Sequence, residues 1–492
     1  MKPVILLGVG ILSLLCGIEN QTDPRAMPTL SFDSRPEPNS TLPAIAIATP
    51  YPVPKYNPAD YLPPAQAGKT VTVTGPNLSD KIQIAEDDPS VGTVRIQGGG
   101  SITKQVTLKK HTVFDGATYS CDVQGVTDFG VFLIADGVLV EGTWRAPQIL
   151  VDYFNRGNGG SSRDSYLLRL QALSDFGSGT TILEPTFATA SPAVGVFQAL
   201  GDACCSHTGK AHDIAVVGFH FKGRQQKYDG GVRSTVVFGN CNRCSAQNNY
   251  LEDTASIGIE FGGSALEHGN YSNDCLAWHN VTSGVAAANI AAVNSENLLA
   301  VENYALRPGH HNPHFGGGVC GFDLETNSAA DHSKNIRVFN NLYDYEGSMS
   351  ESAGNAVCLQ VPYFGANHGV VIAANNVAIG GREDQVHRYM SNGIFLNGLT
   401  DCKIVNNYVF RTAQNAIQAY KLNRCLIQDN DFESTGGGGN PSIELRGVMN
   451  SVIKGNAYRE RAGLAIGTQP GAIDRCGKGN VFQGIEAVQV CP

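Results

Sequence analysis

The chain has 492 residues, of which 42% are hydrophobic and only 16% are charged, and its net charge is −9. The low charge content and the 57 glycines argue against a coiled coil, a helical bundle and a charged disordered chain. The net negative charge indicates no extended basic surface of the kind that binds nucleic acid, so we expect no nucleic-acid partner.

The first 66 residues are expected to lie outside the folded domain. Residues 1–16 are typical of a signal peptide, because Lys2 precedes an apolar run over 4–15 that is shorter than the about 20 residues of a membrane span. Either ordinary cleavage or lipidation of Cys16 fits, and lipidation would anchor the protein to a membrane. Residues 17–66 are rich in Pro, Ser, Thr and Asn, which predicts an extended tether. We therefore expect a secreted, periplasmic or cell-surface protein.

A single repetitive domain is predicted over residues 67–492. A strand ending in Asn recurs at intervals of 23 to 38 residues, which indicates a solenoid with loop insertions. Residues three and five positions before each Asn are small or apolar, so they are expected to point inward. The Asn itself is expected at a sharp left-handed corner, where stacked Asn side chains can hydrogen-bond. The series is Asn249, Asn280, Asn303, Asn341, Asn376, Asn407, Asn430, Asn456 and Asn480.

A second strand with alternating apolar and polar residues precedes most of these Asn-ending strands. Aligning the coils gives two outward rows. The first contains Glu260, Ala291, Asp323, Cys358, Phe395, Gln418 and Glu444, and the second contains Gly262, Val293, Glu325, Gln360, Asn397, Tyr420 and Arg446.

These features resemble the pectate-lyase-like superfamily of single-stranded right-handed parallel β-helices. The resemblance rests on the Asn-Asn corners at 248–250, 340–342, 375–377 and 406–408, and on the strands stacked before them. It is strong over 236–482 and weaker over 80–235. It implies an all-β solenoid, a capping helix over 79–87 and a polysaccharide substrate. The chain lacks the catalytic motifs of polygalacturonases and pectate lyases, so no catalytic residue is carried over.

The 13 cysteines are predicted to be mainly core residues. Cys244, Cys275, Cys402 and Cys425 share one inward repeat position, and buried Cys behaves as a small hydrophobe. We expect Cys402 and Cys425 in particular to be stacked and unbridged. The best candidates for a disulfide are Cys476 and Cys491, near the end of the chain. The Cys241–Cys244 pair has no second pair at zinc-site spacing, so neither a metal nor a cofactor is expected.

Loop insertions flank the second strand on both sides and are expected to wall a cleft over it. On one side they span 304–320, 342–355 and 378–392, and on the other 262–274, 326–335 and 362–368. Asp323 and Glu325 share one face of the strand between the longest loops. Two residues of strand separate them by about 6.5–7 Å, near the lower end of the spacing in inverting glycosidases. The alternative is that these carboxylates only keep the surface soluble.

Further site residues are predicted around this pair. Glu260 lies two coils away, and the loop over 307–314 carries three histidines and an arginine that could act as a base, an anion clamp or metal ligands. The catalytic candidates are Asp323, Glu325, Glu260 and His314. The substrate-binding candidates are His310, His311, Arg307, Gln360, Asn397, Tyr420, Arg446, Arg382 and Arg388.

The sequence therefore predicts an exported carbohydrate-active enzyme that cleaves a polysaccharide in a groove, as a glycoside hydrolase or a polysaccharide lyase. The alternatives are a non-catalytic glycan-binding or adhesive surface protein and a sugar epimerase or transferase. Fold alone does not choose between them.

Overall fold

The computed structural model describes part of the chain, and every structural statement below concerns that part. The described residues are 55–123, 130–155, 180–185, 195–199, 210–223, 234–254, 257–262, 271–285, 288–306, 320–326, 332–344, 359–360, 366–373, 375–378, 392–410, 412, 414–433, 435, 440–459, 469–475, 477–484 and 487–490. They belong to one compact unit, 48–492. The predicted signal segment, including Cys16, lies outside the described residues. The proposed boundaries of the tether and of the domain stay predictions.

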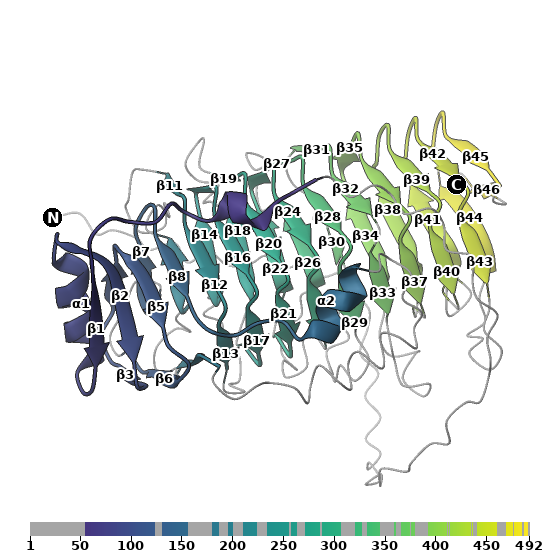
Figure 1. The fold of residues 1–492 in the computed structure, drawn as a ribbon. Coiled ribbons are helices and arrows are strands. Elements are labelled where there is room, and N and C mark those ends of the chain that lie inside the picture. Colours follow the sequence, from purple (N-terminus) through teal and green to yellow (C-terminus); the bar gives the residue numbers. More distant parts are fainter. Residues whose placement is uncertain are drawn as a thin grey trace, which may run out of the picture. The chain divides into compact units, whose positions relative to one another are not determined.

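The described strands form four parallel sheets, and in each sheet neighbouring strands come from successive coils (Figure 1). Sheet A contains β1 (Lys69–Thr74), β2 (Val91–Gln97), β5 (His111–Phe114), β8 (Leu139–Glu141), β12 (Ala215–Val217), β16 (Ser245–Gln247), β20 (Leu276–Trp278), β24 (Leu299–Val301), β28 (Arg337–Phe339), β32 (Val371–Ala373), β36 (Lys403–Val405), β39 (Leu426–Gln428), β42 (Val452–Lys454) and β45 (Val481–Gln483). Sheet B contains β3 (Gly100–Ile102), β6 (Thr118–Cys121), β9 (Ile182–Pro185), β13 (His220–Lys222), β17 (Tyr250–Glu252), β21 (Val281–Ser283), β25 (Tyr304–Leu306), β29 (Leu342–Asp344), β33 (Asn376–Ala378), β37 (Tyr408–Phe410), β40 (Asp431–Glu433) and β43 (Ala457–Arg459).

Sheet C contains β4 (Val106–Leu108), β7 (Phe132–Ile134), β10 (Phe197–Ala199), β14 (Val236–Gly239), β18 (Ile259–Gly262), β22 (Ala288–Val293), β26 (Cys320–Glu325), β30 (Leu359–Gln360), β34 (Ile394–Asn397), β38 (Ile417–Tyr420), β41 (Pro441–Arg446), β44 (Gln469–Arg475) and β46 (Ala487–Val490). The short sheet D contains β11 (Ala211–His212), β15 (Cys241–Asn242), β19 (Ser272–Asn273), β23 (Ser295–Glu296), β27 (His332–Lys334), β31 (Ala366–His368) and β35 (Leu399–Thr400). The chain runs through sheets C, D, A and B in each full coil. This is the right-handed parallel β-helix that the sequence predicts.

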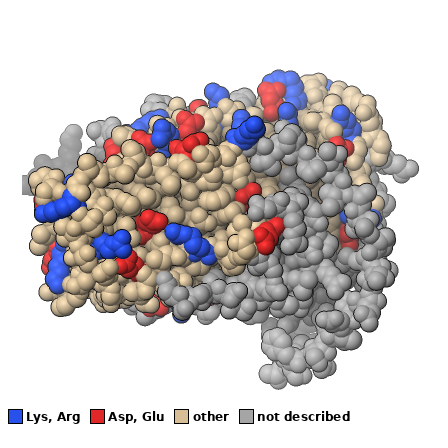
Figure 2. Space-filling model, viewed as in Figure 1, with Lys and Arg blue, Asp and Glu red and all other residues tan. Residues whose placement is uncertain are grey.

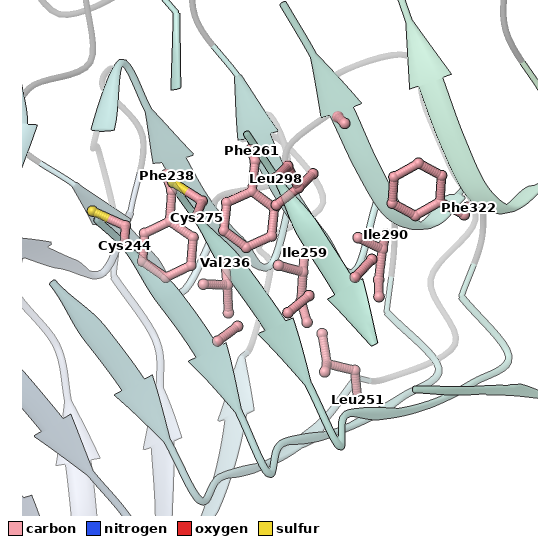
Figure 3. Close-up of a cluster of buried hydrophobic side chains, with 14 of the residues drawn as sticks. Val236, Phe238, Cys244, Leu251, Ile259, Phe261, Cys275, Ile290, Leu298 and Phe322 are labelled. Atoms are coloured by element: carbon pink, nitrogen blue, oxygen red, sulfur yellow. The ribbon is translucent and has the colours of Figure 1, made fainter. Parts of the chain in front are cut away.

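The core lies between the sheets, where each coil stacks its inward side chains on those of the coil before (Figure 3). Phe238 of β14 and Phe261 of β18 stack with ring centroids 5.1 Å apart. Both are fully buried, and burial of one large apolar side chain contributes about 1.5–3 kcal/mol. The alternation that predicted inward positions therefore identifies the core.

A ladder of buried Asn side chains joins the coils between sheets A and B. Asn303 Oδ1 accepts from Asn280 Nδ2 at 3.0 Å, and Asn303 Nδ2 donates to Asn341 Oδ1 at 3.0 Å. The same residue also donates to the backbone carbonyl of Ala277 at 3.0 Å. Seven such side-chain bonds connect Asn249, Asn280, Asn303, Asn341, Asn375, Asn407, Asn430 and Asn456. The expected hydrogen-bonded stack is confirmed.

Three details of the predicted ladder are wrong. Asn480 is not a ladder residue, because it precedes β45 and its Oδ1 accepts from the backbone N–H of Ser451, which lies five positions before the ladder residue Asn456. The ladder residue in one coil is Asn375, not Asn376, because the inward residues of that coil are Val370 and Ile372, one position earlier than predicted. The left-handed residue is also not the ladder Asn but the residue before it: His279 has a φ of 52° and Glu302 a φ of 55°. The turn precedes the ladder Asn, and this frees the Asn side chain to point along the stack.

Two helices among the described residues lie outside the sheets and pack against them. The helix α1 (Leu78–Asp87) begins one residue before the predicted cap and buries Leu78 and Ile82 over the first coil. The helix α2 (Gln148–Asn155) follows β8, and Leu150 packs on the outward face of sheet B beside Tyr304. The cap is confirmed, whereas α2 was not predicted from the sequence.

The last part of the predicted tether is packed on sheet A. We call residues 55–66, with the 3-10 helix η1 (Pro58–Tyr61), the strap; it crosses several coils in Figure 1. Gln247 Nε2 donates to the carbonyl of Pro58 at 3.0 Å, and Gln66 Nε2 donates to the carbonyl of Gly137 at 3.1 Å. Tyr56 and Tyr61 pack with the outward apolar residues of sheet A. These aromatic contacts were not predicted, because a Pro-rich composition indicates an extended tether.

The prediction of unbridged cysteines is wrong for two pairs. Cys402 and Cys425 are inward and buried as predicted, but a disulfide joins them, and another joins Cys241 to Cys244. Adjacent coils bring residues of one inward row into direct contact, so a shared position favours a bridge as readily as free thiols. Cys275 is free and buried, as predicted. Cys476 and Cys491 lie outside the described residues.

Candidate functional site

Asp323 and Glu325 lie on β26, at the outward positions of an alternating strand. The side chains of Phe322 and Leu324 are buried in the core, whereas Asp323 and Glu325 are half-buried on the other face. The flanking insertions at 307–319 and 327–331 lie outside the described residues, so the predicted walls of a cleft stay a prediction. The alternation therefore places both carboxylates on the outer face of sheet C.

The register of sheet C corrects the predicted outward rows. Asp323 is paired with Ala291 on one side and with Gln360 on the other, so Gln360 takes the place in this row that was predicted for Cys358. Gln360 was predicted beside Glu325, but Leu359 is paired with the inward Phe322, and this fixes the register. The remaining pairs agree with the prediction: Phe395 with Gln418, Gln418 with Glu444, Asn397 with Tyr420, and Tyr420 with Arg446.

The surroundings of Asp323 favour its protonated form. Its Oδ1 is buried and has no hydrogen-bond partner among the described residues. Ala291 beside it is fully buried, in a small apolar cluster with Ala288 and Cys320. Burial raises the pKa of Asp323 well above its usual range, and the nearby Glu325 carboxylate raises it further. Two adjacent carboxylates in unlike environments are suited to acid and base roles.

Glu260 is two coils from Asp323, in the same outward row through Ala291. Two strand spacings separate their backbones by about 9–10 Å. Ser234 Oγ donates a hydrogen bond to Glu260 Oε2. Glu260 therefore lies on the same outward face of sheet C as Asp323 and Glu325, but two coils away from this pair.

Aromatic and basic residues follow the carboxylates along sheet C. Phe395 and Tyr420 meet edge to face with centroids 5.4 Å apart, and the Arg446 guanidinium lies 5.2 Å from the centre of the Tyr420 ring. Glu444 Oε1 accepts from Arg446 Nη2 at 2.7 Å and from Arg475 Nε at 3.0 Å.

Glu444 orders this part of the sheet. Burial raises the pKa of Glu444, but hydrogen bonds from Gln418, Arg446 and Arg475 outweigh it and hold that pKa below its ordinary value. Both arginines are therefore held in place while their side chains stay about half exposed, at 51% and 42%. We call Phe395, Asn397, Tyr420, Arg446 and Arg475 the platform. Arg475 is the member that the sequence analysis did not name.

Six of the predicted site residues stay predictions. Arg307, His310, His311, His314, Arg382 and Arg388 lie outside the described residues. Among the described residues there is no group of three or more His, Cys, Asp or Glu side chains that could hold a metal ion. No described helix is long and apolar enough to cross a membrane.

A second polar cluster was missed by the sequence analysis. His279 and Glu302 follow the strands β20 and β24, and His279 Nε2 lies 2.8 Å from Glu302 Oε2. The available signal was their position, because Asn248 and Asn340 occupy the same left-handed corner in neighbouring coils. A bulky ionisable residue at such a corner is unusual, since non-glycine residues seldom adopt positive φ.

The charged residues are interspersed on the face drawn in Figure 2, where blue and red atoms are scattered over a largely uncharged surface. This view agrees with the low charge content of the chain and shows no large patch of one sign among the described residues of this face.

No family model and no curated protein matches the sequence. Among solved structures, the chain is similar to the A-module of a mannuronan C-5 epimerase from Azotobacter vinelandii, with 11% identity, a TM-score of 0.38, and coverage of 89% of this chain and 97% of that one. It is also similar to tailspike protein 3 of bacteriophage CBA120, with 11% identity, a TM-score of 0.49, and coverage of 88% and 61%. A third is the surface protein and adhesin PfbA of Streptococcus pneumoniae, with 12% identity, a TM-score of 0.41, and coverage of 88% and 99%. These likenesses concern the fold alone.

Proposed function

We propose that this protein is an exported glycoside hydrolase acting on a polysaccharide, with Asp323 as general acid and Glu325 as general base. The observation that carries the proposal is the pairing of a buried, unpartnered Asp323 Oδ1 with a second carboxylate two residues away on the same outward face. A carboxyl group whose pKa is raised keeps its proton to a higher pH than an ordinary aspartate and can deliver that proton to a leaving oxygen.

The proposed reaction is a direct displacement by water. Glu325 removes a proton from a water molecule while the oxygen of that water bonds to the anomeric carbon of the sugar. Asp323 gives its proton to the glycosidic oxygen as the glycosidic bond breaks. The backbone spacing of about 6.5–7 Å leaves room for water and is near the lower end of the range for inversion. We therefore expect products of inverted anomeric configuration.

The platform supports a polysaccharide as the substrate. Phe395 lies two coils from Asp323 and Tyr420 three coils away, so a chain along sheet C would pass from the carboxylates to aromatic rings about 10–14 Å on. Arg446 and Arg475 follow and would pair with acidic groups of the sugar. Gln360, Asn397 and Glu260 are the proposed hydrogen-bonding partners along this path.

The competing functions make different demands. A lyase or an epimerase needs a base at the sugar carbon and a cation at the carboxylate, roles for which His310, His311, His314, Arg307, Arg382 and Arg388 remain candidates. A binding or adhesive protein needs the platform alone. The raised pKa of Asp323 supplies a proton donor for a leaving oxygen, which a hydrolase and a lyase both need. Hydrolysis is favoured because Glu325, on the same face of the strand, can activate the water that only this reaction requires.

Export is part of the proposal. Two disulfides among the described residues fit an oxidising compartment, and the apolar segment over 4–15 fits a signal peptide. Cleavage and lipidation of Cys16 remain the two alternatives, and mass spectrometry of the mature N-terminus would separate them.

The test is a screen of purified protein on a polysaccharide panel, with detection of both new reducing ends and unsaturated products. Asp323→Asn and Glu325→Gln should each lower turnover by about 10²–10⁴-fold with the fold intact. Asp401→Asn, an exposed salt-bridged aspartate, is the matched control and should keep full activity. Unsaturated products would identify a lyase instead, and full activity of both site variants would place catalysis elsewhere.

A further inference from the structure

An open cleft of about 540 Å³ lies at the corner between sheets A and B, away from the outward face of sheet C. Three segments far apart in sequence form it: the strap, the region around the start of α2, and the corners of three successive coils. The lining residues that face a ligand or order the site are Tyr56, Arg145, Asn248, Trp278, His279 and Glu302. Its volume is within the range of ordinary small-ligand sites, about 300–1,000 Å³.

Glu302 is the fixed polar centre of this cleft. Its Oε2 lies 2.8 Å from His279 Nε2 and accepts from Trp278 Nε1 at 3.0 Å, and its carboxylate is also hydrogen-bonded to the Tyr56 hydroxyl. Burial raises the pKa of Glu302, but these three donors outweigh it and hold that pKa below the ordinary value. Because its lone pairs are engaged, Glu302 orients the aromatic side chains around it and is not the group that meets a ligand.

Arg145 supplies a partly unused cation at the edge of the cleft. Its Nη1 donates to the carbonyls of Trp144 and Gly142, and its Nη2 donates to Glu141 Oε1 at 3.3 Å. A guanidinium has five N–H donors, so Nε–H and one Nη2 N–H have no partner among the described residues. The side chain is 55% exposed. These N–H groups can donate charge-assisted hydrogen bonds to a carboxylate.

The aromatic lining provides flat surfaces beside this cation. Trp278 and His279 stack with ring centroids 4.0 Å apart, and Tyr56 packs with Trp278 on the outward face of sheet A. Tyr and Trp present large apolar faces with a polar end, and Asn248 adds amide groups at the adjacent corner. Flat apolar faces, amide groups and a guanidinium together suit a ring that carries hydroxyls and a carboxylate.

We propose that this cleft is a second binding site for an acidic glycan, a short oligosaccharide of uronic acids. The carboxylate pairs with Arg145, and a sugar ring lies against Trp278 and Tyr56. The ligand class rests on the proposed function, but the site uses different sheets and none of its residues belongs to the Asp323–Glu325 pair. Because the strap supplies Tyr56 and Pro58, binding also holds the strap on sheet A.

Tryptophan fluorescence tests the proposal directly, because the chain contains only two tryptophans, Trp144 and Trp278. The full-length Trp144→Phe variant reports on Trp278 alone. We expect a saturable fluorescence change on titration with oligomers of galacturonate, mannuronate or glucuronate, and none with a neutral cello-oligosaccharide. If Trp144→Phe does not fold, the wild-type signal should disappear in Trp278→Phe.

The arginine variants give the specific readout. Arg145→Gln should weaken binding about tenfold or more, since it removes charge-assisted hydrogen bonds. Arg424→Gln, an equally exposed arginine paired with Asp401, should leave the affinity unchanged. Binding must persist in the Asp323→Asn and Glu325→Gln variants, which separates this site from the proposed reaction. No Trp278 response to any of the uronate oligomers, or an undiminished response in Arg145→Gln, would overturn the inference.

Discussion

Asp323 is paired across sheet C with Ala291, so a carboxyl group stands beside a fully buried methyl group. Its Oδ1 has no hydrogen-bond partner among the described residues to offset this burial. A buried carboxyl oxygen without a partner lowers the stability of the folded protein. Such a loss of stability is typical of residues that are kept for function.

The first prediction is that Asp323→Asn makes the protein more stable at neutral pH, by about 0.5–2 kcal/mol. In the wild type, the unfolded state ionises above the ordinary aspartate pKa while folded Asp323 stays protonated, so stability falls as pH rises from that value to the raised pKa. Asp323→Asn has no ionisable group at this position, so its stability does not fall in this way as the pH rises. Thermal unfolding of both proteins over a pH series should give curves that converge in acid and diverge toward neutral pH. A constant difference at all pH values would contradict the assigned protonation of Asp323.

The second prediction concerns the Asn ladder. Asn303→Ala removes Oδ1, the acceptor of both the buried backbone N–H and the Nδ2 of Asn280, and it removes the Nδ2 donor to Asn341 Oδ1. It should cost about 3–5 kcal/mol of unfolding free energy, since each buried donor left unpaired costs about 1–3 kcal/mol. Asn242→Ala is the control, because Asn242 is half-buried and accepts one side-chain bond from Asn273. Denaturant unfolding measures both. Equal costs for the two variants would show that the ladder is not a special source of stability.

The third prediction is that Cys402 and Cys425 form a disulfide in the purified protein. Mass spectrometry of the unreduced, digested protein should show the two peptides linked. The bridge closes a segment of 23 residues, so its loss in a Cys402→Ala, Cys425→Ala variant should cost about 2–4 kcal/mol. Cys275→Ala, at the same inward position but without a bridge, provides the comparison. Alkylation of both thiols without reduction would rule the bridge out.

The fourth prediction is that the strap loosens in acid. The folded-state pKa of Glu302 is lowered, so its contribution is present above the ordinary glutamate pKa of about 4.3 and is lost as pH falls through the lowered value. Hydrogen exchange of residues 55–62 should therefore accelerate in that range, beyond the intrinsic pH effect. In Glu302→Gln the acceleration should already be present at neutral pH.

Glu252→Gln is the matched control for the strap. Glu252 Oε2 lies 3.0 Å from His220 Nε2, and its pKa is likewise lowered by that histidine, but the pair lies on sheet B. Exchange of the strap should not change in this variant. Equal acceleration in Glu252→Gln and Glu302→Gln would mean that the strap responds to general loss of stability.

The sequence predicts most of the fold because one physical rule is repeated in every coil. An inward apolar pair followed by an Asn is visible without a structure, and it locates sheet A in coil after coil. Asn376 was predicted as the ladder residue in place of Asn375 because the two asparagines are adjacent and either fits a corner. The error at Cys358 arose because a long insertion precedes β30, and only pairing with Phe322 fixes its register.

Contacts between distant segments could not be predicted. Pro58 and Tyr61 are separated from their partners Gln247 and Ser245 by 189 and 184 residues, and no local pattern records such a contact. The same holds for the cluster around Glu302, whose members come from the strap and from successive coils. By contrast, Asp323 and Glu325 were predicted as neighbours because strand alternation alone places them on one face.

The strap also has a consequence for the order in which the chain is made. Synthesis delivers Tyr56 early and Glu302 only after about three-fifths of the chain, so the N-terminal segment cannot reach its place until the coils that bear its partners have left the ribosome. During that interval the outward apolar face of sheet A around Trp278 is uncovered. The early coils, closed at one end by α1, can meanwhile stack in the order of their synthesis, because each buries its side chains on the coil before it. Docking of the strap is then a late event that marks completion of the coils as far as β24.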